Sequence, residues 1–339
     1  MSPAAVPHIV IFDEPADDRF PGFESGRPVS ELPFWSKFTV ESVTDAMFKR
    51  FDYSRIKIPD GDIDALCGVL ENTGGDILVA GRSGNITMPD TVPLNGMSRG
   101  KGIVKLQIGG VPSDLYLIGK SDLIKAVRSL SEHGNSPGRI PVLLFEKYFF
   151  DGFERIVGIG GSSFLLRDGF EFFRENLRFA SYLNDPLFME FYSGLADTPT
   201  EGSSVSDRGV VRESVLGGGC RICGTIENSV IFHDVVVEEG AAVRDSVILP
   251  FNRVEGGCII QNTLVLPRKG GGIGAGSIIG GTDLTTNRSF PRVLREGLTI
   301  VGEGIEIPPG SRIGSGCLVR GPGSSGRRIR LKNGCVLDR

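Results

Sequence analysis

The sequence predicts an α/β domain followed by a parallel β-helix, a solenoid of triangular coils. The first observation is a six-residue period of aliphatic residues, which fits neither a helix at 3.6 residues per turn nor a strand with a period of two. The second is a unit of glycine, small residue, any residue and aliphatic residue, repeated in step with that period. The third is a change of pattern near residue 200, before which aromatic residues and helix and strand patterns prevail.

The six-residue period predicts the β-helix, because hexapeptide repeats give one short strand and one corner per unit. We expect the aliphatic side chains to point into the prism and to stack one coil apart. The stretch from about residue 203 leaves room for roughly seven coils of about eighteen residues. The period joins Val301, Ile307, Ile313, Val319, Leu331 and Leu337, with Ser325 as the interruption; Val237 and Val243; Val254, Ile260 and Leu266; and Ile273 and Ile279.

The glycine unit predicts the corners, where glycine can adopt positive φ without a Cβ clash. Four of the six cysteines occupy its small position, namely Cys220, Cys258, Cys317 and Cys335. Cys220 and Cys223 also form a C-x-x-C, which could begin a zinc or redox site. Packing is the better explanation, and we expect no metal. The unit occurs at residues 219–222, 240–243, 257–260, 310–313, 316–319 and 334–337.

Before residue 200, apolar runs predict strands and periodic segments predict helices. We expect Ser121 to cap one helix and Asp168 another, the latter carrying Phe170, Phe173, Leu177 and Phe179 on one face. The expected strands lie at 8–12, 76–81, 101–110 and 114–119, the expected helices at 41–51, 64–75, 121–127, 168–183 and 185–195, and a linker at 196–207.

Length and charge exclude several classes of partner. A chain of 339 residues predicts two or more domains. A net charge of −4 and a pI near 5.6 give no reason to expect nucleic acid or an anionic membrane. There is no apolar run near eighteen residues and no secretory leader pattern at the start. We therefore expect a soluble, cytoplasmic protein.

Residues 209–250 closely resemble the opening coils of the left-handed β-helix of bacterial glucose-1-phosphate adenylyltransferases (ADP-glucose pyrophosphorylases), enzymes of glycogen biosynthesis. The phrase at 224–232 carries most of the likeness, and 114–127 and 168–179 are similar to segments of the family's catalytic part. The resemblance covers about the last 170 residues well and the first 130 only in fragments. It implies a truncated, degenerate nucleotidyltransferase-like (Rossmann-like) domain at 1–200 and a left-handed β-helix at 201–339.

The family's phosphate-binding loop has no counterpart in this sequence. That loop, usually G-G-x-G-T-R-L, offers backbone N–H groups to the nucleotide phosphates. Here the segment after the first strand is "DEPADDRF", with no glycine, one proline and the acids Asp13, Glu14, Asp17 and Asp18. Only Arg19 and the phrase at 32–34 match the pattern, and Val29 stands where the resemblance places a lysine.

The resemblance also implies a missing metal ligand. The family holds Mg²⁺ on an aspartate after a strand that ends in G-D, and here Arg82 follows Gly81. An arginine cannot bind a divalent cation, and the interval between the expected strands is short for a sugar-phosphate pocket. We therefore assign no catalytic, cofactor-binding or metal-binding residue, and expect Mg²⁺ only if the nucleotidyltransferase site proves active.

Four residual features have two readings each. Residues 158–161 ("GIGG") could contact phosphate, but a tight turn between strands is the better reading because no helix pattern follows. Arg19 and Arg27 could meet an anion, although isolated surface arginines are usually solvated. His233 could serve as the general base of a hexapeptide acyltransferase.

Together these features predict a non-catalytic or regulatory relative of the sugar-1-phosphate nucleotidyltransferases. It would form a homo-oligomer, or a hetero-oligomer with an active homologue, and would sense a sugar phosphate or nucleotide. The alternatives are an active adenylyltransferase, a hexapeptide-repeat acyltransferase and a purely structural solenoid. The segment 282–297 breaks the six-residue period, so we expect a loop that leaves the prism and packs either on the solenoid or on a neighbour.

Overall fold

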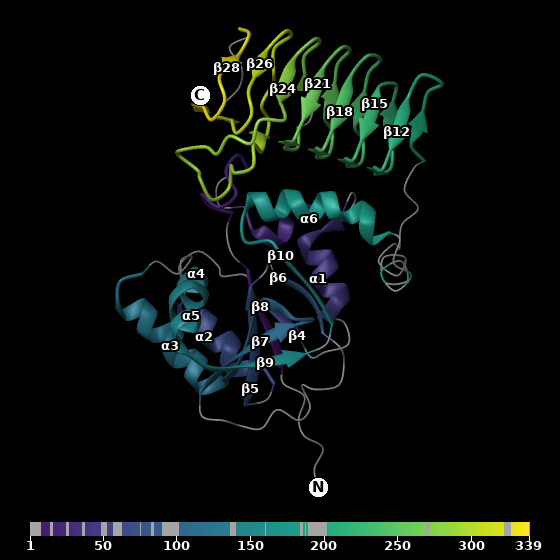
Figure 1. The fold of residues 1–339 in the computed structure, drawn as a ribbon. Helices are drawn as coiled ribbons and strands as arrows, with labels where there is room; N and C mark the ends of the chain where they lie inside the picture. Colours follow the sequence, from purple (N-terminus) through teal and green to yellow (C-terminus); the bar gives the residue numbers. More distant parts are fainter. Residues whose placement is uncertain are drawn as a thin grey trace. The chain divides into compact units, whose positions relative to one another are not determined.

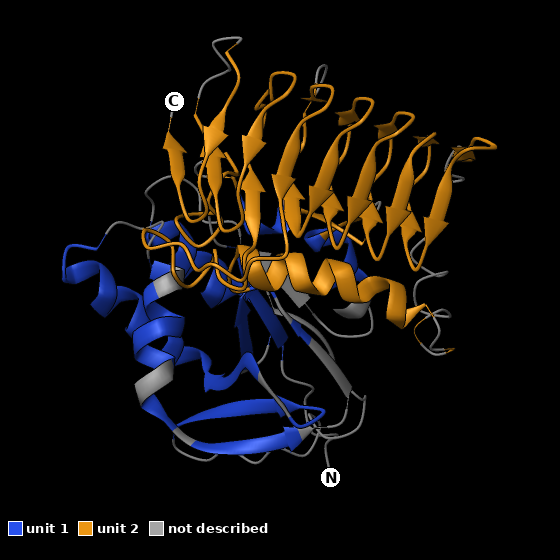
Figure 2. Cartoon of the chain, turned by 45° about the horizontal axis from the view of Figure 1, so that its top comes forward, with its two compact units in different colours: residues 1–15, 28–32, 40–166 blue, residues 16–27, 33–39, 167–339 orange. Residues whose placement is uncertain are grey.

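The computed structural model describes residues 8–13, 16–24, 27–35, 38–48, 53–56, 63–74, 76–82, 85–89, 102–135, 140–159, 161–183, 186, 188, 202–268, 272–321 and 327–338. The chain forms two compact units (Figure 2). The N-terminal unit comprises 1–15, 28–32 and 40–166, and the solenoid unit comprises 16–27, 33–39 and 167–339. Because this grouping is discontinuous in sequence, it does not test the predicted boundary between residues 200 and 201, which stays a prediction.

The N-terminal unit is built on a six-stranded mixed sheet in the order β4-β1-β5-β8-β7-β9. β1 pairs in parallel with β4 and β5, β8 is antiparallel to β5 and β7, and β9 is parallel to β7. The four expected strands are confirmed. The bounds are β1 (His8–Phe12), β4 (Tyr53–Ile56), β5 (Ile77–Arg82), β7 (Ile103–Ile108), β8 (Val111–Gly119) and β9 (Phe153–Ile159), with β6 (Asn85–Pro89) and β10 (Gly161–Leu165) forming a separate antiparallel pair.

Alternation along β1 divides the apolar side chains of this unit between the two faces of the sheet. Val10 and Phe12 join one core cluster, which includes residues of α2 and α3, whereas Ile9 and Ile11 join a second. The helical segments are η1 (Val29–Glu31), α1 (Val40–Phe48), α2 (Ile63–Asn72), α3 (Lys120–Glu132), α4 (Ile140–Leu143), the π-helical turn η4 (Leu144–Tyr148) and α5 (Phe149–Gly152).

The expected cap at Ser121 is wrong. α3 begins at Lys120, and its N-cap is Gly119 in an extended conformation without a side-chain hydrogen bond. A Cβ on Gly119 would lie 3.0 Å from Oδ2 of Asp122, so the carboxylate of the first turn lies over the bare Cα. The strand β8 therefore passes directly into the helix, and the serine falls inside the first turn.

The solenoid unit is a parallel β-helix, as the hexapeptide pattern predicts, with three faces (Figure 1). The first face is β11 (Ser204–Val205), β14 (Arg221–Ile222), β17 (Val236–Val237), β20 (Arg253–Val254) and β23 (Gly272–Ile273). The second is β12 (Val210–Arg212), β15 (Thr225–Glu227), β18 (Ala242–Arg244), β21 (Ile259–Gln261), β24 (Ile278–Gly280), β26 (Arg312–Ile313) and β28 (Arg330–Leu331). The third is β13 (Val215–Leu216), β16 (Val230–Ile231), β19 (Val247–Ile248), β22 (Thr263–Val265), β25 (Thr299–Val301), β27 (Leu318–Arg320) and β29 (Val336–Asp338).

The aliphatic stacks inside the prism are confirmed. Val243, Ile260, Ile279 and Ile313 are register partners along the second face and lie in one buried cluster. One member of the predicted period is wrong, because Val265 rather than Leu266 joins that cluster. Leu266 is buried on the outer side, within reach of Gly22.

Two kinds of corner explain the one-residue slips in the period. Between the second and third faces, the early coils turn on Asn228, Asp245 and Asn262, with φ of +46°, +48° and +49°. There the inward residues lie five apart, as from Ile260 to Val265. The late coils turn on glycine, as at Gly316 with φ of +69°, and the spacing is six. Asparagine and aspartate tolerate this left-handed conformation better than other side chains.

The third face of the solenoid is apolar on both sides. Val247 and Ile248 are both fully buried, as are the adjacent pairs of the neighbouring coils. α6 (Gly169–Tyr182) packs on the outer side at β16 and β19, and the short hairpin β2 (Pro33–Phe34) and β3 (Phe38–Thr39) belongs to the same unit. The pairs are Val230–Ile231, Val247–Ile248, Leu264–Val265, Ile300–Val301 and Leu318–Val319.

The start and the face of α6 agree with expectation. The Asp168 side chain accepts hydrogen bonds from the backbone N–H groups of Phe170 and Glu171, which confirms the N-cap. Of the four residues expected on the apolar face, Phe170, Phe173 and Phe179 are buried and Leu177 is half-buried. Asn176 is also buried, because its Oδ1 accepts the backbone N–H of Trp35 at 3.1 Å. The expected helix at 185–195 falls almost wholly outside the described residues, as does the start of the linker at 196–207.

The insertion 282–297 is a loop, as predicted, and it packs on the solenoid. It leaves the prism after β24 and returns at β25. Asn287 is fully buried, and its Nδ2 donates to the carbonyl oxygens of Gly316 (2.9 Å) and Gly334 (3.1 Å) on the last two coils. No helix within the described ranges has both the length and the apolar composition needed to span a bilayer.

Candidate functional site

A nucleotide site in the N-terminal sheet is expected at the carboxyl edge of its parallel strands. Ligands of open α/β sheets bind outside these strand ends. Phe12 ends β1 and pairs with Arg82, which ends β5. Asp13 and Arg82 therefore stand together at this edge, where the family resemblance places a phosphate loop and a metal-binding aspartate.

Asp13 is committed to local structure. Its side chain is buried, and it accepts hydrogen bonds from the Ser30 hydroxyl (2.5 Å) and the Ser30 backbone N–H (3.3 Å). Ser30 lies in η1, so the carboxylate holds this turn against the end of β1. This carboxylate therefore has a structural role, and it places negative charge where a phosphate would have to bind.

The segment after Asp13 packs on the solenoid. The backbone N–H of Glu303 donates to the Gly22 carbonyl oxygen at 2.9 Å, and Nη2 of Arg27 lies 2.7 Å from Oε1 of Glu303. Gly22 has φ of +96°, and a Cβ there would lie 3.1 Å from Ile300 and 3.2 Å from Leu266. A glycine is thus present in this segment, but it serves close packing on the third face.

Neither candidate arginine of this segment is an isolated, solvated cation. Arg19 bonds the Asp17 carboxylate through Nε at 2.8 Å, and its carbonyl oxygen accepts the Gly169 N–H at 2.7 Å. Arg27 contacts both Glu24 and Glu303. The structure therefore differs from the solvated reading, because carboxylates of the same unit already neutralise both side chains.

Arg82 is buried, with 8% of its surface exposed. Its guanidinium lies 3.9 Å from Oδ2 of Asp114, 4.0 Å from Oε1 of Glu146 and 5.8 Å from the ring centre of Phe145. A resident cation thus faces two carboxylates at the position that the resemblance gives to a metal ligand. Among the described residues, no group of three or more His, Cys, Asp or Glu side chains is placed to hold a metal ion.

The glycines at 158–161 connect two strands. β9 ends at Ile159 and β10 begins at Gly161, while the next helix begins only at Gly169. Gly160 lies outside the described residues. The described neighbours therefore match the turn reading, since no helix N-terminus follows to orient N–H groups toward a phosphate.

His233 lies at a corner of the solenoid, between β16 and β17. Its Nδ1 is 2.9 Å from Oδ2 of Asp234, and its ring meets Phe251 edge-on with 4.9 Å between the ring centres. About a third of its side chain is exposed. A carboxylate beside imidazole can fix the tautomer, so this pair has one feature of a general base.

The C-x-x-C has a packing explanation. Cys220 points into the prism, where its Sγ lies 3.0 Å from the Phe232 carbonyl oxygen, and burial raises the pKa of its thiol. Burial likewise raises the pKa of the Cys258 and Cys317 thiols. Cys223 is half-buried. The thiols inside the prism thus stay protonated, whereas zinc and redox chemistry require thiolates.

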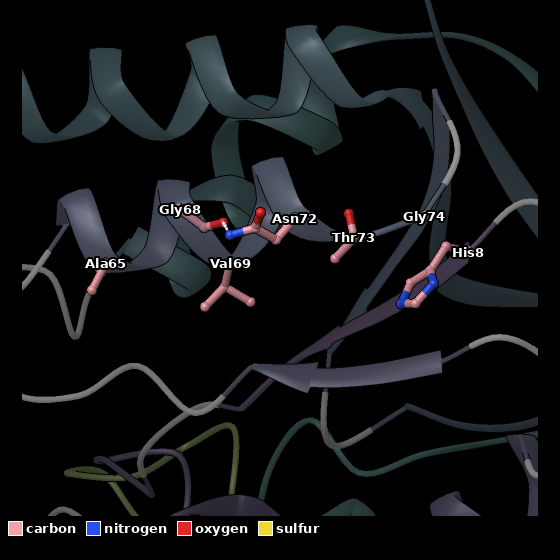
Figure 3. A pocket seen from close by; sticks show the side chains of 7 residues that line it. All are labelled: His8, Ala65, Gly68, Val69, Asn72, Thr73 and Gly74. Atoms are coloured by element: carbon pink, nitrogen blue, oxygen red, sulfur yellow. Dashed lines mark hydrogen bonds between the residues drawn. The ribbon is translucent and has the colours of Figure 1, made fainter.

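A shallow, open hollow of about 660 Å³ lies at the edge of the sheet opposite to the expected site (Figure 3). His8 begins β1 and Gly74 precedes β5, so the hollow is at the amino ends of these strands. Sequence reasoning did not identify it, although small residues on α2 gave a signal. Its lining is His8, Ala65, Gly68, Val69, Asn72, Thr73 and Gly74.

Comparisons with known proteins agree with the geometry of the solenoid. The family model described as "GlmU-like, C-terminal hexapeptide" matches residues 200–301. Glucose-1-phosphate adenylyltransferase of Corynebacterium jeikeium (strain K411) is 32% identical over 100 residues, 29% of this chain and 24% of the relative. The enzyme of that name in Bacillus mycoides (strain KBAB4) is 30% identical over 141 residues, 40% of this chain and 36% of the relative.

A shorter match, at 40% identity over 74 residues, is to glucose-1-phosphate adenylyltransferase 2 of Alkalilimnicola ehrlichii, and covers 22% of this chain and 17% of the relative. The chain thus matches little more than a third of these relatives' lengths at most. The resemblance to this enzyme family is confirmed at that level, as weak, partial identity together with the hexapeptide repeat.

Proposed function

We propose that this chain is a non-catalytic, regulatory relative of the glucose-1-phosphate adenylyltransferases. It acts by associating with copies of itself or with an active homologue, and it responds to a sugar phosphate or nucleotide. The observation that supports this most is the position of residues 16–27. The segment that follows β1, where the enzymes cradle phosphates, is built into the solenoid unit through Gly22 and Arg27.

The hydrogen bonding of this segment argues against phosphate binding. A cradle needs several N–H groups that are open to the ligand. Here the N–H of Ala16 donates to the Arg27 carbonyl oxygen, and that of Phe20 to the Asp17 carbonyl oxygen. The N–H of Arg19 donates to the Asp17 carboxylate. These donors are occupied, and a phosphate arriving beside Asp17 would meet like charge.

Arg82 supports the same proposal from the other strand. A divalent metal neutralises charge at the reacting phosphate in phosphoryl and nucleotidyl transfer. The guanidinium supplies a fixed positive charge but no site for the metal, and Asp114 and Glu146 lie beside it. Reaction would therefore lack both the loop and the metal anchor.

An assay for pyrophosphate tests the catalytic half of this proposal. Purified chain is incubated with ATP, glucose 1-phosphate and Mg²⁺, and pyrophosphate release is followed. We expect no turnover above a blank, and Arg82→Asp as a single change restores none because the loop is also absent. Release of pyrophosphate that depends on protein concentration would overturn the proposal in favour of an active adenylyltransferase.

Co-purification tests the assembly half. The tagged chain is expressed in its own organism, and the captured material is identified by mass spectrometry and sized by light scattering. We expect either a homo-oligomer or a complex with an active glucose-1-phosphate adenylyltransferase whose response to effectors changes on binding. A strict monomer that captures no homologue would contradict this role.

Acyl transfer is a second candidate function, because the contact between His233 and Asp234 gives this histidine one feature of a general base. The test is an assay for free coenzyme A from acetyl-coenzyme A and a panel of sugar amines and alcohols. Transfer that His233→Asn abolishes, while the fold is unchanged, would favour this function. The expected result under the proposal above is no transfer by either protein.

A further inference from the structure

Cations accumulate on the last two coils of the solenoid. The strands β26 and β28 of these coils are labelled in Figure 1. Arg312 begins β26 and Arg330 begins β28, and the two are register partners on the second face. Both are exposed, as is Arg328. Ile329, between Arg328 and Arg330, is buried, so the two arginines flanking it share the outer side. Arg328 and Arg330 on the last coil and Arg312 on the coil before it thus lie at neighbouring strand starts of the second face, beside the exposed Arg327.

The pairing of Arg312 with Arg330 is electrostatically unfavourable. Adjacent strands lie about 4.8 Å apart, so the two side chains start from neighbouring backbone positions, where like charges are destabilising. Among the described residues, no carboxylate forms an ion pair with Arg312, Arg328 or Arg330. An external anion would remove this repulsion.

Earlier coils of the same face pair their arginines with a carboxylate of this chain. Arg212 and Arg244 flank Glu227 in register, and each bonds its carboxylate at 2.8 Å. These three residues stack in the column that ends the strands of the second face. The column that begins the strands runs Thr225, Ala242, Ile259 and Ile278 before Arg312 and Arg330, and it supplies no carboxylate. This contrast within one repeating structure indicates that the counterion of the terminal arginines comes from outside the chain.

Two of the three guanidinium groups, those of Arg312 and Arg328, are held in place. Nη1 of Arg312 donates to the carbonyl oxygens of Gly276 (2.7 Å) and Ser311 (3.1 Å). Arg328 lies over the bare Cα of Gly310, because a Cβ built there would be 3.1 Å from its Nε and 3.3 Å from its Cζ. Fixed guanidinium groups lose less conformational freedom on binding than free ones.

We propose that this arginine cluster, formed by Arg312, Arg328 and Arg330, is a binding site for phosphoryl groups. The planar fork of arginine matches phosphate oxygens with two parallel hydrogen bonds. The site spans two coils, far less than the roughly 800 Å² per partner of a stable protein interface. Among the described residues of the last two coils there is no large exposed apolar side chain of the kind that protein interfaces use. This inference rests on the sensing part of the proposed function and gives it a place and a chemistry.

Calorimetry with inorganic pyrophosphate tests the site on the full chain, at low salt and without Mg²⁺. We expect saturable binding that is weakened at least tenfold in the double variant Arg328→Gln/Arg330→Gln. The matched control, Arg212→Gln/Arg221→Gln, removes the same charge from the other end of the solenoid and should bind within twofold of the wild type. Glucose 1-phosphate and ATP are then titrated as competitors.

Thermal unfolding provides a second readout. Without anion, the Arg328→Gln/Arg330→Gln protein should unfold at the same or a higher temperature than the wild type, because the repulsion is relieved. Pyrophosphate should raise the unfolding temperature of the wild type and of the control only.

Each contrary outcome has a definite meaning. No saturable binding by the wild type, equal weakening in both variants, or undiminished binding in the Arg328/Arg330 variant would overturn the site. Failure of both organic phosphates to displace pyrophosphate would overturn its sensing role. Turnover of ATP with glucose 1-phosphate would instead sink the non-catalytic proposal and leave the arginine cluster standing.

Discussion

Buried hydroxyl groups tie successive coils together at the start of the third face. The Ser229 hydroxyl accepts the Ser246 N–H at 3.1 Å, and the Ser246 hydroxyl accepts the Thr263 N–H at 3.1 Å. Each hydroxyl also donates to the carbonyl oxygen two residues earlier in its own coil. The recurrence of serine or threonine after an asparagine or aspartate was visible in the sequence. Its role was not, because the partner lies one coil away.

Replacing Ser246 with alanine should therefore destabilise the solenoid. The change leaves the buried N–H of Thr263 without its acceptor, at a cost of about 1 to 3 kcal/mol in the free energy of unfolding. The exposed Ser204→Ala serves as control and should change stability by about 0.5 kcal/mol or less. Urea unfolding of the three proteins is the measurement, and equal effects of the two changes would refute the ladder.

Burial of the thiols predicts their reactivity. Because desolvation raises the pKa of Cys220, Cys258 and Cys317, little thiolate forms at neutral pH. Iodoacetamide should label the half-buried Cys223 and Cys335 first. Peptide mass spectrometry of the native protein over time checks this order. Labelling of Cys258 as fast as Cys223 would show that the prism opens on that timescale.

At the scale of elements, the six-residue period predicted the strands and the inside of the prism, because one aliphatic position per strand repeats through every coil. It did not predict the cover of the third face, although adjacent apolar pairs such as Val247–Ile248 mark strands buried on both sides. At the N-terminal sheet, Arg82 and Asp13 were identified from the sequence, but their partners were not. Glu146 and Ser30 reach them only through tertiary structure.

The adjacent isoleucines Ile259 and Ile260 of β21 lie on opposite sides of the second face. Ile260→Ala removes a fully buried side chain from the stack and should cost about 2 to 5 kcal/mol in the free energy of unfolding. Ile259, 40% exposed on the outer side, provides the control, and Ile259→Ala should cost about 1 kcal/mol or less. Chemical denaturation measures both. A larger loss for Ile259→Ala would place a covering partner on this face.

Glu171, in the first turn of α6, makes the stability of the fold depend on pH. Burial raises the pKa of Glu171, although its carboxylate accepts the Arg167 N–H at 2.9 Å. A carboxyl whose pKa is higher in the folded than in the unfolded state stabilises the fold at low pH and loses that contribution as the pH rises through the folded pKa. Glu171→Gln keeps an acceptor without the charge.

The variant should therefore gain stability relative to the wild type as the pH rises from about 4 to 7. Thermal unfolding across this range gives the difference directly. The matched control substitution is Glu132→Gln, at an exposed glutamate in the last turn of α3. A stability difference between Glu171→Gln and the wild type that stays constant with pH would contradict this prediction.

At the scale of the whole molecule, the solenoid unit requires segments from both ends of the sequence. The outer side of the third face is buried by α6 and by residues 16–27 of the same unit, as at Leu266 and Ile300. A fragment limited to residues 201–339 would expose this apolar side. The sequence pattern alone favoured a domain boundary there, since composition and period change near residue 200.

We expect the 201–339 fragment to self-associate and to bind a hydrophobic dye, in contrast to the full chain, because exposed apolar faces of this extent promote association. Light scattering and dye fluorescence at equal molar concentration are the measurements. The matched control is the same fragment with Leu264 and Ile300 changed to threonine, which should associate less. A monomeric, dye-negative 201–339 fragment would show that the cover is dispensable.

The contact between Arg27 and Glu303 joins residues 276 positions apart. During synthesis at about 5 to 20 residues per second, roughly 14 to 55 s separate the appearance of these two side chains. The segment around Arg27 lacks this partner while the ribosome makes the intervening residues. Vectorial folding of this unit can therefore finish only after Glu303 has been made, and chaperones have that interval in which to act.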